Sequence, residues 1–211
     1  MWAERGKGEP MGEEHRELVD GMFGNFPPKA GTMLDVGCGV GMALQQAMDL
    51  TTIQPSGIDL SPEMINLGKQ RLPQADLQVG SAAKLPWGDN TFDQAISVEA
   101  MYYFANPESD LAEICRVIKP GGTFTSVIEF FADNTGSANW SVHFPMKMHL
   151  LSTQEWKDIF AKAGFKNVET AIVKRKTYET KEEFHPNKYY KTFEEYWSYI
   201  DGGALVIQGE V

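Results

Sequence analysis

Three glycines at alternate positions and two aspartates are the residues of this chain whose types and spacing best suit a ligand. Gly37, Gly39 and Gly41 follow a short apolar run that contains Asp35, and Asp59 lies 18 residues after Gly41. Glycines so spaced let the backbone turn sharply and let a ligand lie against exposed N–H groups. A carboxylate at about 20 residues beyond such a turn suits the hydroxyl pair of a ribose. The pattern predicts a nucleoside site, although the turn could be purely structural and Asp59 could serve in a loop or helix cap.

The residue after the third glycine argues against one class of nucleoside. A dinucleotide fingerprint has its last glycine where this chain has Met42. A nicotinamide oxidoreductase is therefore disfavoured. The chain also contains no P-loop, no G-x-S-x-G elbow and no H-E-x-x-H motif.

Proton-accepting side chains gather later in the chain, after the runs that look like strands. They could act as a general base, but each could also be a core or surface residue, and the sequence does not choose among them. His143 and His149 are six residues apart, with no cysteine or carboxylate at the spacing of metal ligands, so no metal site is expected there. The candidates are Glu99, Tyr102, Tyr103, Glu129, His143 and His149.

Strands and helices alternate along most of the chain and would position these residues. Short apolar or β-branched runs predict strands at 32–36, 56–60, 76–79, 92–98, 123–128, 165–173 and 203–207. Helical spacing and capping residues predict helices between them, with Ser61 and Pro62 starting one and a Ser152/Glu155 capping box another. The fold class expected is α/β, a doubly wound, mostly parallel seven-stranded Rossmann-like sheet with an antiparallel last strand. Ligands of such sheets bind at the carboxyl ends of the strands.

The chain divides into a short N-terminal part and one domain. Residues 1–30 read as a polar tail and a helix over 11–26, which is either a lid or a packing element; Pro27-Pro28 ends it. Residues 31–211 form the ligand-binding domain. Within it, residues 175–200 are an aromatic insert before the last strand, which could cap a pocket or pack as a helix with Tyr189, Phe193, Tyr196, Trp197 and Ile200 on its buried face.

Composition sets the broad class. The 211 residues are 42% hydrophobic and 23% charged, with a net charge of −10 and only two cysteines. This is ordinary globular composition without a disulfide framework, and no apolar run is long enough for a membrane span. The acidic balance disfavours a nucleic-acid substrate. We expect a cytoplasmic protein.

Five stretches in order resemble class I S-adenosylmethionine-dependent methyltransferases, in particular the small-molecule branch with quinone-biosynthesis and phosphoethanolamine-type enzymes. The resemblance covers residues 31–128 closely and 152–173 fairly well. The matching stretches are Met33 to Gly41 (MLDVGCGVG), Gly57 to Met64 (GIDLSPEM), Gly80 to Trp87 (GSAAKLPW), Thr91-Phe92-Asp93 and Cys115 to Gly122 (CRVIKPGG).

The resemblance implies a role for each matching residue. Gly37, Gly39 and Gly41 would pass beneath the methionine part of S-adenosylmethionine, and Asp35 would orient its amino end. Cys38, between the glycines, belongs to the same cofactor-binding stretch and is expected to pack. The family usually has Asp where this chain has Ser81, which implies weaker cofactor binding. The other expected contacts are Asp59 with the ribose, Leu60 with the adenine, Ser81 and Ala82 with the adenine edge, and Val98 and Glu99 with the methionine part and the acceptor. Met64 is also expected at the cofactor.

Two functions from different classes remain open. The first is methyl transfer by in-line displacement to a small molecule, with Tyr103, His143 or Glu99 as the catalytic candidates. The alternative is a regulatory or partner protein that binds S-adenosylmethionine without turnover. Base-amino methylation of nucleic acid is disfavoured, since the strand ending at Val98 leads into Glu99-Ala100 and not into an Asn/Asp-Pro-Pro-aromatic run.

Overall fold

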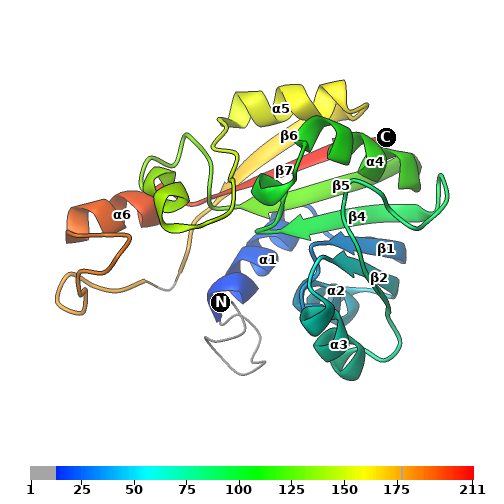
Figure 1. Ribbon diagram of the computed structural model, residues 1–211, viewed down its shortest axis with the longest axis horizontal. Coiled ribbons are helices and arrows are strands. Elements are labelled where there is room, and N and C mark those ends of the chain that lie inside the picture. Colours follow the sequence, from blue (N-terminus) through cyan, green and yellow to red (C-terminus); the bar gives the residue numbers. More distant parts are fainter. Residues whose placement is uncertain (1–12, 177) are drawn as a thin grey trace.

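The computed structural model describes residues 13–176 and 178–211 and has one seven-stranded sheet at its centre (Figure 1). The strand order is β3-β2-β1-β4-β5-β7-β6. All strands run in the same direction except β7, which is antiparallel to β5 and β6 on either side of it. This confirms the expected fold class. The strands are β1 (Gly31–Val36), β2 (Ile53–Asp59), β3 (Asp76–Val79), β4 (Phe92–Val98), β5 (Ile118–Ile128), β6 (Lys166–Val173) and β7 (Ala204–Glu210).

Helices cover both faces of the sheet, as Figure 1 shows. One face carries α1 (Glu13–Asn25), α2 (Met42–Leu50) and α3 (Pro62–Arg71), and the other carries α4 (Pro107–Val117) and α5 (Thr153–Lys162). The sixth helix, α6 (Phe193–Gly202), projects beyond the end of the sheet at which the parallel strands finish. Two short 3₁₀ turns, η2 (Met101–Tyr103) and η3 (Ala138–His143), lie at the same end.

The helix starts follow local capping chemistry. Ser61 Oγ accepts from the N–H of Met64 at the start of α3, and Ser152 and Glu155 form the expected capping box of α5. A second box, Thr192 with Glu195, starts α6 four residues later than the aromatic spacing indicated. Tyr189 therefore lies in a loop, and Trp197 is 40% exposed, so the expectation that both share a buried helical face is wrong. The buried residues of α6 are Tyr199 and Ile200.

Two strands begin earlier than expected. β2 includes Pro55, which is tolerated because β3 pairs only from Ser56 onward and leaves that edge of β2 open. β5 starts at Ile118, directly after α4, so the strand start expected at 123 is wrong by five residues. Its pairing with β4 shifts register over this stretch, where Gly121 takes φ +78°.

Two apolar clusters hold the layers together. On the α1 side, Leu18, Val19 and Met22 are fully buried against the sheet, so α1 is a packing element. On the α4 side, the cluster is centred on aromatic residues, and Phe124 stacks on Phe160 of α5 at 5.6 Å. Residues 1–12 of the expected N-terminal tail and helix lie outside the described residues. Within the described residues, no helix is both long and apolar enough to cross a membrane.

Candidate active site

The glycine turn joins β1 to α2 at the carboxyl edge of the sheet. Gly37, Gly39 and Gly41 have φ values of +82°, +52° and +80°, which L side chains rarely adopt. A Cβ on Gly37 would lie 2.4 Å from that of Ala100, whereas one on Gly39 would meet open space. The turn is therefore packed against the end of β4 at one glycine and open to a ligand at another.

Asp59 fixes the turn from the end of β2. Its Oδ2 accepts from the N–H of Gly39 at 2.9 Å, and its Oδ1 accepts from the N–H of Ser61 at 2.8 Å. A carboxylate has about four acceptor positions, so two remain available to hydroxyl groups. Asp59 thus has a structural role in the loop and capacity for a ligand as well. Leu60, next to it, is 75% exposed.

Asp35 is a buried acid beneath this turn. Its side chain is only 2% exposed, and its Oδ1 has no hydrogen-bond partner. Burial, with a smaller contribution from the charge of Asp59, raises the pKa of Asp35 to about 8. A buried carboxyl oxygen without a donor costs free energy, and a cationic ligand group would satisfy it.

The other residues expected at the cofactor lie around the same edge. Cys38 is buried against Gly57, and burial raises the pKa of its thiol, which disfavours the reactive thiolate. Met64 lies in the first turn of α3 and is half-buried. Ser81 Oγ accepts from the N–H of Ala83 at 3.2 Å, and Ala82 is buried beside it.

Glu99 lies at the end of β4, one residue after Val98. It has a φ of +52°, an uncommon value for a residue with a side chain and one that is often found at functional sites. Its Oε2 accepts from Tyr102 Oη at 2.8 Å, and its Oε1 accepts from the N–H of Glu129 at 2.6 Å. Burial and the charge of Glu129 raise the pKa of Glu99.

A buried ion pair follows on the next strand. Glu129, after β5, accepts two hydrogen bonds from Arg175, Nε to Oε1 at 2.6 Å and NH2 to Oε2 at 2.5 Å. Their side chains are 4% and 6% exposed. Tyr199 of α6 also donates to Glu129 Oε1 at 2.8 Å, so the insert is tied to the sheet through one carboxylate.

The insert is held close to the sheet by backbone contacts. Asn134 Nδ2 donates to the carbonyl oxygens of Tyr199 and Gly203, and a Cβ on Gly136 would lie 2.1 Å from the backbone nitrogen of Tyr199. Trp140 donates from Nε1 to Tyr190 Oη at 2.8 Å and stacks on Phe130. These contacts extend the aromatic core outward into the insert.

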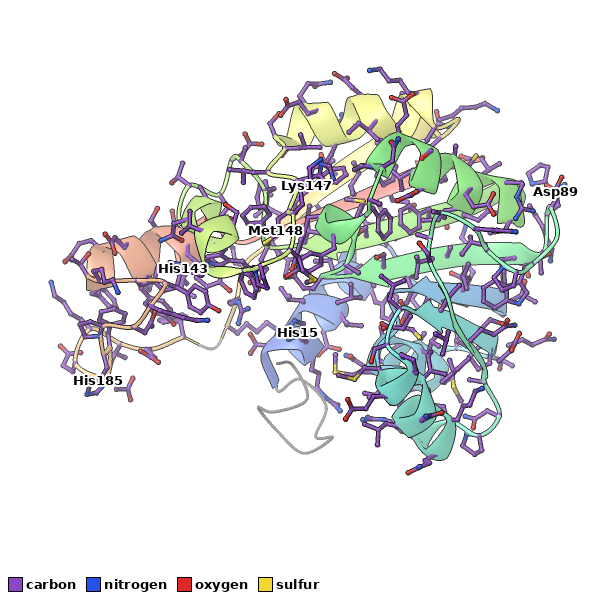
Figure 2. The ribbon with its side chains drawn as sticks, in the orientation of Figure 1. His15, Asp89, His143, Lys147, Met148 and His185 are labelled. Atoms are coloured by element: carbon purple, nitrogen blue, oxygen red, sulfur yellow. The ribbon has the colours of Figure 1, made fainter. Side chains whose placement is uncertain are left out.

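The three catalytic candidates do not form one cluster. Tyr103 lies against Tyr102, the partner of Glu99, with ring centres 4.5 Å apart. Burial is the largest cause that raises the pKa of Tyr103, to about 12, so its hydroxyl stays protonated near neutral pH. His143 lies among the side chains between η3 and the insert (Figure 2), with its ring edge-on to Tyr189 at 5.4 Å. Glu99 and Tyr103 are thus linked through Tyr102, while His143 belongs to the insert side.

Sequence reasoning missed the partners of Glu129. Arg175 stands in a Lys-Arg-Lys run that resembles a solvated stretch, and Tyr199 was one of many aromatic residues. The only signal was a basic residue directly after a strand end, which is too common to be specific. Within residues 13–176 and 178–211, no group of three or more His, Cys, Asp or Glu side chains could hold a metal ion.

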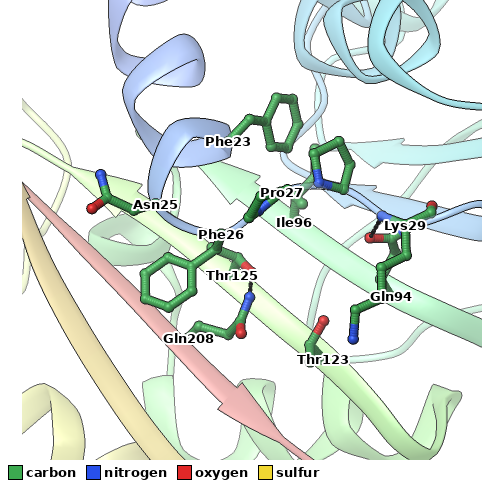
Figure 3. A pocket seen from close by; sticks show the side chains of 11 residues that line it. Phe23, Asn25, Phe26, Pro27, Lys29, Gln94, Ile96, Thr123, Thr125 and Gln208 are labelled. Carbon is green, nitrogen blue, oxygen red and sulfur yellow. Dashed lines mark hydrogen bonds between the residues drawn. The ribbon is translucent and has the colours of Figure 1, made fainter.

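A pocket of about 120 Å³ lies elsewhere (Figure 3). It is formed on the α1 face, where the α1–β1 linker crosses the sheet near the amino ends of β4 and β5. Gln208 donates to Thr125 there, and Gln94 exchanges hydrogen bonds with the backbone of Lys29. It is remote from the glycine turn, which lies at the carboxyl edge of the sheet.

Known proteins match the chain over the residues that form the carboxyl edge of the sheet. A family model described as "Methyltransferase domain" covers residues 34–126. Phosphoethanolamine N-methyltransferase 2 of Caenorhabditis elegans is 28% identical over 169 residues, or 76% of this chain and 38% of that protein. Demethylmenaquinone methyltransferase of Symbiobacterium thermophilum is 38% identical over 120 residues, or 52% and 46%. The chain spans less than half the length of both.

Solved structures match over nearly the whole chain. A complex between the Haloferax volcanii Trm112 methyltransferase activator and the putative methyltransferase matches with a TM-score of 0.89 and 30% identity, covering 99% of this chain and 95% of that one. Geranyl diphosphate methyltransferase in complex with S-adenosylmethionine shares the fold, with a TM-score of 0.70 and 17% identity over 93% and 83%. This chain therefore belongs to the methyltransferase family.

Proposed function

We propose that the enzyme transfers a methyl group to a small-molecule acceptor held at the carboxyl edge of β4 and β5. The contact between Gly37 and Ala100 carries this proposal. It brings the turn expected to hold the cofactor directly beside Glu99 and its hydrogen-bonded neighbours. The printed names of the relatives, a phosphoethanolamine and a demethylmenaquinone methyltransferase, are consistent with small acceptors.

The residues at the glycine turn fit the cofactor. The unpartnered Oδ1 of Asp35 is a buried acceptor, and the amino group of S-adenosylmethionine is a cationic donor. Asp59 keeps acceptor positions for the ribose hydroxyls, and the open space at Gly39 admits a chain against the backbone. Leu60 and Ala82 provide apolar surface for the adenine, with Met64 and Ser81 next to them.

The protein contributes mainly through position. When bound, S-adenosylmethionine supplies a methyl group that its positively charged sulfur has already activated. Holding an acceptor in line with that methyl group can lower the barrier by about 7–11 kcal/mol. Asp35 and Asp59 fix one end of this arrangement, and Val98 and Glu99 border the point where the acceptor must approach.

The insert closes the acceptor side in this proposal. Its loop and helix present Tyr189, Tyr190 and Tyr199 beside Trp140, and His143 contacts the same group. Aromatic faces bind flat or cationic molecules. Residues 175–200 would therefore act as a cap that also belongs to a local core.

A screen with labelled donor tests the proposal. The enzyme is incubated with a metabolite extract and S-adenosylmethionine labelled in its methyl group, and the labelled small molecule is identified. Transfer of label that depends on Asp59 supports the proposal. Binding of the cofactor by calorimetry with no label transferred to any extract component would instead support a binding protein without turnover.

The Haloferax volcanii complex favours a second proposal, that this enzyme also binds an activator protein. The support is the match over 99% of this chain to a methyltransferase solved with its Trm112 activator. Co-expression with such an activator followed by size-exclusion chromatography tests it. Co-elution is expected, and separate elution would contradict the proposal, so the acceptor screen is run with and without the activator.

A further inference from the structure

Glu99 is built unlike the other candidate bases. It follows β4 directly, it is only partly exposed, and its backbone has a positive φ. Two donors hold its carboxylate, Tyr102 Oη on one oxygen and the N–H of Glu129 on the other. Each oxygen keeps one acceptor position, so the group can still receive a proton from a ligand.

The charges that face Glu99 come from two neighbouring elements. Glu129 follows β5, and Arg175 follows β6 and binds Glu129 through two hydrogen bonds. Tyr102 and Tyr103 of η2 complete the titratable groups around it. The guanidinium of Arg175 binds Glu129, and its charge also acts on Glu99. Like charges on Glu99 and Glu129 oppose each other's ionisation.

We propose that Glu99 takes up the proton that the acceptor loses, and that Arg175 and Glu129 set the pH at which it can do so. The inference rests on the proposed function and deepens it. Glu99 is the catalytic residue, since it would touch the acceptor, whereas Arg175 and Glu129 are positioning residues that act through it. The acceptor is then of a definite class: a nucleophile that carries a proton, such as a hydroxyl, an N–H or an acidic C–H.

The step balances with the groups present. A lone pair or carbanion pair of the acceptor forms the bond to the methyl carbon, and the carbon–sulfur bond breaks with its electron pair remaining on sulfur. The acceptor proton passes to a free position of the Glu99 carboxylate, which becomes a carboxylic acid and later releases the proton to water. Tyr102 keeps the carboxylate in place through its hydroxyl.

The charges of Arg175 and Glu129 predict in which direction the pKa of Glu99 shifts when either is removed. The positive charge of Arg175 lowers the pKa of Glu99, and the negative charge of Glu129 raises it. Arg175→Gln should therefore move the rise of kcat with pH to higher pH, and Glu129→Gln should move it to lower pH. A purely structural pair would lower activity in both variants without opposite shifts.

The experiment measures kcat and KM against pH for the acceptor found in the screen. Glu99→Gln should lower kcat by about 100-fold or more and remove its rise with pH. Arg175→Gln and Glu129→Gln should shift the midpoint in opposite directions. Glu113→Gln is the matched control, because Glu113 also pairs with an arginine, Arg116 at 2.7 Å, but on α4; its profile should match that of the unaltered enzyme.

A second readout needs no turnover. In protein labelled with carbon-13 at glutamate carboxyls, one signal should titrate well above the ordinary glutamate range, vanish in Glu99→Gln and shift oppositely in the other two variants. Glu129→Gln keeps the test decisive if Arg175→Gln fails to fold. An unchanged kcat in Glu99→Gln, or shifts in the same direction, would overturn the inference while leaving methyl transfer standing. Absence of any transfer, with the expected titration present, would count against the proposed function alone.

Discussion

The two halves of the carboxyl edge are built by different means. At the ends of β1 and β2, the ligand groups lie in two short continuous stretches, and the hydrogen bond that joins these stretches, from Gly39 to Asp59, spans 20 positions. At the ends of β4 and β5, the polar cluster joins residues far apart in the chain, with Glu129 and Arg175 separated by 46 positions. The first half is a local motif, and the second depends on the tertiary fold and on the insert.

The largest expected effect concerns the polar cluster at the ends of β4 and β5. Arg175→Met leaves the buried carboxylate of Glu129 without its cation, so we expect the free energy of unfolding to fall by about 3–5 kcal/mol. Urea denaturation measures this. Lys181→Met is the control, since Lys181 pairs with Glu194 in the same insert with both side chains about 70% exposed, and its loss should cost at most about 1 kcal/mol. Equal losses in both variants would show that the buried pair is no special link between insert and sheet.

The same contrast explains how far the sequence could predict this molecule. The glycine turn, Ser61 with Pro62, and the Ser152/Glu155 capping box were predictable because their causes lie within a few residues. So was the fold class, since strand–helix alternation leaves little choice of sheet.

The rest depended on contacts distant in the sequence. The early start of β2 at Ile53 depends on its pairing with β1, where Ile53 lies opposite Gly31, and the register shift in β5 depends on β4. The partnership of Glu129 with Arg175 left no local trace, because a strand end followed by a basic residue occurs in many proteins. Candidate bases could be named from the sequence, but their environments could not.

The second prediction concerns Asp35, at the end of β1, and the pH dependence of the free energy of unfolding. Its pKa of about 8 in the folded protein exceeds its ordinary value of 3.8, so between these values the folded state holds a proton that the unfolded chain has released. Asp35 therefore favours folding at low pH, and that contribution is lost as the pH rises toward 8. Asp35→Asn should raise the free energy of unfolding at pH 8 by a few kcal/mol, since one pKa unit corresponds to about 1.4 kcal/mol.

Asp35→Asn should also bind the cofactor more weakly. Without the carboxylate, calorimetry should show the binding free energy weakened by about 1.5–3 kcal/mol. Urea denaturation at pH 5 and pH 8 measures the stability effect. Asp110→Asn is the control, because Asp110 is also 2% exposed but accepts from Asn106 and Ser109; it should gain no stability at pH 8. A stability at pH 8 that does not exceed that of the unaltered enzyme would contradict the account of Asp35.

The third prediction concerns Asp59 alone. Asp59→Ala should weaken binding of S-adenosylmethionine by about 1.5–3 kcal/mol, because it removes charged hydrogen bonds to the ribose and loosens Gly39. Calorimetry gives the affinity. Asp76→Ala removes an exposed aspartate of β3 that accepts from Trp87 Nε1, and it should leave the affinity unchanged. Unchanged affinity in Asp59→Ala would refute its assignment to the ribose.

The smallest expected effect tests whether cofactor affinity at the ends of β1 and β2 can be changed without altering the pH profile set by the cluster at the ends of β4 and β5. Ser81 stands at the position where the resemblance to the family implies Asp, and its hydroxyl already accepts from the N–H of Ala83. An aspartate there would add a charged acceptor toward the adenine edge, and charged hydrogen bonds exceed neutral ones by about 1 kcal/mol. Ser81→Asp should therefore tighten cofactor binding by roughly fivefold, and Ser81→Ala should weaken it slightly. The pH profile of kcat should move in neither variant, because Ser81 does not contact the Glu99 network; a shift would mean that the two halves of the edge are coupled.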